Sequence, residues 1–97
     1  MSAFHLETTD NTALVRLDGE LTIEEAGALR VALRTALRRP RELVIEPAGL
    51  ARIDVAALQV LLAAARIARS VRVAPSPAPA WTAALERYAL APAFAQS

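Results

Sequence analysis

Apolar and polar side chains alternate in the first part of the chain, as they do in strands with one covered face. Within residues 12–17, the positions on one face are all apolar: Ala13, Val15 and Leu17. Residues 3–8 predict a second, less regular strand, and the turn-forming residues at 9–11 predict that the two strands form an antiparallel hairpin. Asp18 and Gly19 are expected to end the second strand.

The spacing of apolar residues then changes to three and four, which indicates a helix. Its apolar positions are Ala26, Leu29, Leu33, Ala36 and Leu37. Thr22 and Glu25 stand three residues apart at its start, as in a capping box, where the hydroxyl and the carboxylate each accept a hydrogen bond from a free backbone N–H. Pro40 is expected to stop this helix.

A short apolar strand with LVI at its centre follows at 42–46. Apolar residues on both of its faces indicate a strand in the interior of a sheet. Pro47 and Gly49 are expected to close it. The chain is then expected to turn through residues 48–53 and to enter a second helix, which runs to about Ser70.

The stretch RIDVAALQVL at 52–61 places one carboxylate directly before an almost wholly apolar helix. Asp54 is predicted to cap this helix by accepting a hydrogen bond from the N–H of Ala56 or Ala57. The apolar front half of the helix predicts burial. The apolar run at 55–65 is well short of the ~20 residues that a membrane span needs, so no membrane insertion is expected.

Residues 71–73 predict a fourth strand, and the Pro-rich segment 75–79 leads to a last helix. This helix is expected to contain Trp81, Leu85, Tyr88 and Leu90. Trp81 and Tyr88 are seven residues apart, so they are predicted to share one helix face that packs onto the sheet or a second subunit.

The predicted order is therefore β-β-α-β-α-β-α. It indicates an α/β fold with a small mixed sheet of about four strands, about three helices packed mainly on one face, and right-handed parallel crossovers. The chain has 97 residues, a length typical of one small core, so residues 1–97 are expected to form a single domain.

Composition excludes several classes of function. The chain has no Cys and only one His, His5, so neither a metal site, a cofactor nor a Ser/His/Asp triad is expected. A net charge of +1 gives no general attraction to nucleic acid. Residues 1–11 lack the pattern of a signal peptide, so a cytoplasmic location is expected.

All the basic residues are Arg, and Arg30, Arg34 and Arg38 lie at i, i+4 on one face of the first predicted helix. We favour a solvated face, because no aromatic residues are interleaved with these arginines. Anion recognition, by contact with an acidic partner or a nucleotide phosphate, is the alternative. No GxGxxG or Walker-type loop is present, so nucleotide hydrolysis is not expected.

The element order, together with LVIEPAGLARIDVAALQVLL at 43–62, resembles the STAS family of bacterial anti-sigma factor antagonists. The matching positions follow the order of the family without a gap: Glu46, Gly49, Ile53, Asp54 and Leu58. The resemblance implies the STAS fold and a non-enzymatic module for protein–protein interaction. It also implies a partner-binding site at the start of the second helix: Asp54, Val55, Ala56, Ala57 and Leu58.

The chain departs from the family directly after Asp54. The family carries a phosphorylated Ser or Thr there, whereas this chain has Val55, followed by Ala56 and Ala57 in place of Ser and Gly. A phosphate at a helix N-terminus would be held by free N–H groups and the helix dipole. Because Val has no hydroxyl, no phosphorylation is expected at this position.

The leading hypothesis is a cytoplasmic module of bacterial signal regulation. Its expected partner is an anti-sigma factor kinase or a chemotaxis or two-component protein, since DVAALQ resembles a run in STAS proteins of such systems. The alternative is the STAS subunit of an ABC-type lipid-transport complex, which would dock on its ATPase through the same helix end. The oligomeric state stays open, with a homodimer as one alternative.

Overall fold

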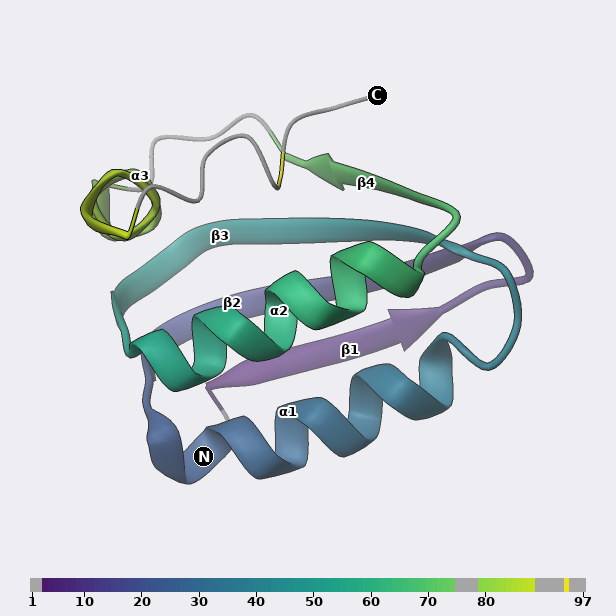
Figure 1. Cartoon of the computed structure of the whole chain (residues 1–97), viewed down its shortest axis with the longest axis horizontal. Coiled ribbons are helices and arrows are strands. Elements are labelled where there is room, and N and C mark those ends of the chain that lie inside the picture. The colour runs from purple at the N-terminus through teal and green to yellow at the C-terminus, as the bar shows by residue number, and fades with distance from the viewer. Residues whose placement is uncertain (1–2, 75–78, 89–93, 95–97) are drawn as a thin grey trace.

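The computed structural model describes residues 3–74, 79–88 and 94, and its elements follow the order β-β-α-β-α-β-α (Figure 1). The strands are β1 (Phe4–Thr8), β2 (Thr12–Leu21), β3 (Glu42–Ile53) and β4 (Ser70–Val73). The helices are α1 (Ile23–Ala36), α2 (Val55–Ile67) and α3 (Pro79–Arg87). The predicted α/β fold class is confirmed.

The four strands form one mixed sheet in the order β1-β2-β3-β4. β1 and β2 pair antiparallel, as the hairpin prediction required, whereas β3 runs parallel to both β2 and β4. The parallel pairs arise because α1 and α2 each return the chain to the starting edge of the sheet. As a result, β2 and β3 end at the same edge, where α1 and α2 begin.

α1 and α2 lie side by side over the same face of the sheet (Figure 1). Their inner sides are small or branched apolar side chains: Ala26, Leu29, Leu33 and Ala36 from α1, and Ala57, Leu58, Leu61 and Ala64 from α2. The sheet supplies the facing layer, which includes Val15, Leu17, Leu43 and Ile45. Each fully buried Leu or Ile contributes roughly 1.5–3 kcal/mol, so this layer is the main source of stability.

Two strands are longer than the sequence predicted. β2 continues through Asp18 and Gly19, and β3 continues through Pro47 and Gly49. Register irregularities on either side of the Asp18–Gly19 pair absorb the extra residues of β3, and Gly19 adopts a φ of 70° that a residue with a Cβ rarely takes. The predicted strand ends were wrong because a bulged ladder tolerates Pro and Gly.

Both α1 and α2 end earlier than the sequence predicted, and Leu37 and Arg38 follow α1 instead of belonging to it. α1 ends at Ala36, before Pro40, and Arg41 caps it by donating from Nη1 to the carbonyl oxygen of Ala36 over 2.6 Å. α2 ends at Ile67, three residues before the predicted end, because Ser70 already pairs with Glu42 in the sheet.

α3 confirms only part of the prediction for the last helix. It begins at Pro79, the last residue of the predicted link, and lies beside β3. Trp81 is buried and packs edge-on against Phe94, with ring centroids 5.2 Å apart. Tyr88 follows the helix and is exposed, so it does not join Trp81 in the core, and its alternative contact with a second subunit stays a prediction. The predicted helical residue Leu90 and the link residues 75–78 lie outside the described residues.

Candidate functional site

The N-termini of α1 and α2 meet at one edge of the sheet. Leu21 and Ile53 are partners in the parallel ladder of β2 and β3, and the next residue, Asp54, donates its backbone N–H to the carbonyl oxygen of Leu21 over 3.0 Å. This main-chain bond places the first residues of both helices next to each other. We call the surface formed by Ile23, Asp54, Val55 and Ala56 the docking end.

Asp54 is the N-cap residue of α2, but its carboxylate caps the other helix. Oδ2 accepts a hydrogen bond from the N–H of Ile23, the first residue of α1, over 3.2 Å. Oδ1 lies 3.5 Å from Nη2 of Arg52. The predicted bond from Ala56 or Ala57 is not formed, since no side-chain cap hydrogen bond is made within α2. Asp54 therefore joins the two helices.

The predicted capping box at the start of α1 is not formed either. Thr22 is the N-cap residue, but its side chain makes no cap hydrogen bond, and the N–H of Glu25 donates to the backbone oxygen of Thr22 over 3.0 Å. The side-chain acceptor for this helix start comes from Asp54, 31 residues away. Local spacing carries no signal for a cap that is supplied from so far along the chain.

Two branched apolar side chains are exposed at the docking end. Ile23 is 68% exposed and Val55 is 41% exposed, and each is the first residue of its helix. Exposed apolar side chains grouped at one place are typical of surfaces that contact another protein. Ile23 could not be recognised as a site residue from the sequence, because an apolar residue three positions before Ala26 is also compatible with the buried stripe of α1.

The five predicted partner-binding residues differ in how far their side chains are exposed to solvent. Val55 is exposed, and Asp54 and Ala56 are partly exposed. Ala57 and Leu58 are both 0% exposed, because they turn toward the sheet in the first turns of α2. A partner cannot reach these two side chains, so the predicted contact set narrows to Asp54, Val55 and Ala56, which Ala57 and Leu58 support from the core.

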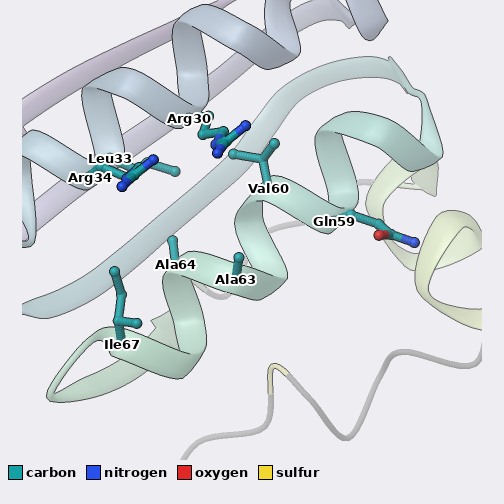
Figure 2. Close-up of a pocket in the computed structure, with 8 residues that line it drawn as sticks. All are labelled: Arg30, Leu33, Arg34, Gln59, Val60, Ala63, Ala64 and Ile67. Atoms are coloured by element: carbon teal, nitrogen blue, oxygen red, sulfur yellow. The ribbon is translucent and has the colours of Figure 1, made fainter.

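The predicted basic face of α1 is exposed. Arg30, Arg34 and Arg38 make no ion pair and no side-chain hydrogen bond with any residue that the structure describes. Arg30 and Arg34 border an open groove of about 490 Å³ between α1 and α2 (Figure 2). Arg38 lies outside this groove, beyond the end of α1 at Ala36.

A further set of ion pairs lies on strands β1, β2 and β3. His5 Nε2 is 3.3 Å from Glu7 Oε1, and the guanidinium of Arg16 lies 2.9 Å from Glu46 and 3.7 Å from Glu7. The hydrogen bond to Glu46, and then the charge of Glu7, raise the pKa of Arg16. All these side chains are at least one-third exposed, as expected of surface ion pairs.

Within residues 3–74, 79–88 and 94, no three His, Cys, Asp or Glu side chains are arranged so that they could hold a metal ion. None of the helices in this part of the chain is long and apolar enough to cross a bilayer.

Known proteins share this architecture. The family model described as "Mlab, STAS domain" matches residues 4–91. The unphosphorylated form of the anti-sigma factor antagonist SpoIIAA has a TM-score of 0.78 at 23% identity, with 98% of this chain and 88% of that chain covered. An anti-sigma factor antagonist from Mycobacterium paratuberculosis has a TM-score of 0.78 at 21% identity, with 97% and 87% covered.

The phosphorylated form of the Bacillus cell fate determinant SpoIIAA is also similar, with a TM-score of 0.70 at 22% identity, covering 98% of this chain and 91% of that chain. At these identities the likeness concerns the fold. No curated protein matches the sequence.

Proposed function

Since the chain belongs to the STAS domain family described as Mlab, we propose that it is a non-enzymatic module of bacterial signal regulation that binds a regulatory protein. The observation that carries this proposal is the exposed apolar pair of Ile23 and Val55 beside Asp54 at the docking end. The fold that it shares with anti-sigma factor antagonists supports an anti-sigma factor kinase as the partner, in the cytoplasm. A chemotaxis or two-component protein is the other member of the same partner class.

Docking in this proposal is not switched by phosphate at position 55. Val55 is the first helical residue of α2, where free N–H groups and the helix dipole favour an anion, yet its side chain carries no hydroxyl. An exposed Val favours an apolar contact with the partner that phosphorylation of this residue cannot switch off. After incubation with a serine kinase from the same organism, mass spectrometry should find no phosphate on residues 54–58. Phosphate on any of them would contradict this part of the proposal.

The binding surface is tested with Ala56→Glu. Ala56 is partly exposed in the first turn of α2, which contains no acidic residue, so a Glu there is compatible with the helix dipole and should leave the fold intact. A carboxylate at the interface should weaken binding at least about tenfold, or 1.4 kcal/mol, by isothermal titration calorimetry. The titrant is an anti-sigma factor kinase or a histidine kinase, namely the one whose gene lies nearest to the gene of this protein.

Ala28→Glu is the matched control, since Ala28 is exposed on α1 and is not part of the docking end. Far-UV circular dichroism of both variants should stay close to that of the unaltered protein. If Ala56→Glu binds the kinase as tightly as Ala28→Glu does, the interface lies elsewhere on the molecule.

A second candidate function is favoured by the same exposed Val55. The STAS subunit of an ABC-type lipid-transport complex would dock on its ATPase through this helix end, and a permanently bound subunit needs no hydroxyl for switching. The neighbouring genes separate the two candidates. A histidine kinase and a receptor support signalling, whereas a permease, an ATPase and a lipid-binding subunit support transport. Tight binding to such an ATPase, lost in Ala56→Glu, would establish the second candidate.

A further inference from the structure

The groove between α1 and α2 is a second surface on the same two helices. Its volume is about 490 Å³, and its floor consists of the apolar residues Leu33 from α1 and Val60, Ala63, Ala64 and Ile67 from α2 (Figure 2). Ile67 is 60% exposed, although it is a large apolar side chain. None of these residues belongs to the docking end, so the groove is a separate surface.

The border of the groove is positively charged. Figure 2 shows the side chains of Arg30 and Arg34 between α1 and α2, with Arg30 beside Val60. Neither guanidinium is paired with a side chain in the described part of the structure. The acidic residues of α1 are in its first turn, and α2 contains none. Among the described residues, therefore, no acidic side chain pairs with these two arginines, and the groove favours an anionic ligand.

The shape of the groove favours an elongated ligand. The floor residues of α2 recur at three- and four-residue steps from Val60 to Ile67, a length of roughly 10 Å along the helix axis. Ala63 and Ala64 are small, so the backbone of a third helix can approach them closely. Arg30 and Arg34 lie one helical turn apart, roughly 6 Å, which matches the spacing of two carboxylates one turn apart on a facing helix.

We propose that this groove binds an amphipathic α-helix of a partner protein. The apolar stripe of that helix covers the floor, and Asp or Glu residues one turn apart pair with Arg30 and Arg34. The proposal does not rest on the function of the docking end, because it uses none of the residues there.

The test uses a fluorescein-labelled peptide of about five helical turns and the whole protein. The peptide carries Leu at three- and four-residue spacing and Glu at i, i+4 beside this stripe. One control peptide has Lys in place of every Glu, and another has the same composition with the Leu residues scattered around the helix. Fluorescence anisotropy at low salt should show saturable binding of the first peptide, and binding at least about tenfold weaker for each control.

Protein variants locate the binding site. Arg30→Glu/Arg34→Glu should weaken binding of the Glu peptide at least about tenfold and should instead bind the Lys peptide. Ala63→Phe keeps all charges, fills the exposed floor and should also weaken binding. The control Arg69→Glu/Arg87→Glu changes two exposed arginines that do not border the groove, and should bind as the unaltered protein does. Circular dichroism checks that each variant is folded.

Three results would overturn the proposal. The first is the absence of saturable binding of the Glu peptide. The second is equal binding of the scattered peptide, which would mean attraction by charge alone. The third is binding of the Glu peptide by Arg30→Glu/Arg34→Glu and by Ala63→Phe as tightly as by the unaltered protein. If decanoate binds to these residues while the Glu peptide does not, the groove is a site for a small amphiphile and the assignment of a helix is wrong.

Discussion

The docking end and the groove lie on the same pair of helices, but their charged groups are held differently. The carboxylate of Asp54 is used within the fold, where it accepts a hydrogen bond from the N–H of Ile23 over 3.2 Å. The guanidinium groups of Arg30 and Arg34 have no partner among the described side chains. A charge that the fold satisfies contributes to stability and geometry, whereas an unpaired charge is available to a ligand. Removing the two kinds of charge should therefore change stability in opposite directions.

The largest expected effect concerns the support of the docking end. Leu58 is 0% exposed beneath it, so Leu58→Ala should lower the free energy of unfolding by about 2–5 kcal/mol through lost burial and a cavity. Urea unfolding followed by circular dichroism measures this change. Leu62→Ala is the control, because Leu62 is only partly buried and should cost less. Equal losses in the two variants would mean that Leu58 is not the better-buried side chain.

Asp54→Ala should have the next largest effect. It removes the acceptor of the Ile23 N–H and should lower the free energy of unfolding by about 1 kcal/mol. Asp54→Asn keeps an acceptor oxygen and should lose less. Amide hydrogen exchange should be faster at Ile23 in Asp54→Ala than in the unaltered protein. Unchanged exchange at Ile23 would show that the carboxylate does not hold this N–H in solution.

Removing a charge at the groove should have the opposite sign. Arg30→Gln relieves the repulsion between Arg30 and Arg34 at i, i+4, so the free energy of unfolding should rise by about 0.2–0.5 kcal/mol at low salt. The gain should vanish at about 1 M salt, where the Debye length is about 3 Å. Arg52→Gln, which removes a charge 3.5 Å from Asp54, should not stabilise the protein. A loss of stability in Arg30→Gln would show that the fold does use this guanidinium.

The smallest effect on stability is expected for Val55→Ser. Val55 is 41% exposed, so the free energy of unfolding should change by less than about 0.5 kcal/mol. The substitution restores a hydroxyl at the first position of α2. Incubation with a serine kinase from the same organism should then add phosphate at position 55 of the variant alone, as read by mass spectrometry. If the variant is not modified, the missing hydroxyl is not what prevents phosphorylation at this position.

Much of the fold could be predicted because its elements leave local patterns. The alternation at 12–17 and the helical spacing from Ala26 to Leu37 reflect which side chains face the core, and the element order then limits the topology. The ends of β2 and β3 were predicted wrongly, because Gly19 and Pro47 end strands in most contexts but are accommodated here by bulges between two paired strands. Such pairing involves residues about 30 positions apart and leaves no local pattern.

The candidate sites also combine features that a local sequence pattern reveals with features that depend on long-range contacts. Residue type and local spacing were enough to show that position 55 has no hydroxyl, that an Asp precedes an apolar helix and that Arg30 and Arg34 share one helix face. Three other features are visible only in the folded protein: Asp54 caps the other helix, Ala57 and Leu58 are buried, and Arg30 and Arg34 border an apolar groove. Each of these depends on how α1 and α2 pack on the sheet, and so on contacts between residues far apart in the chain.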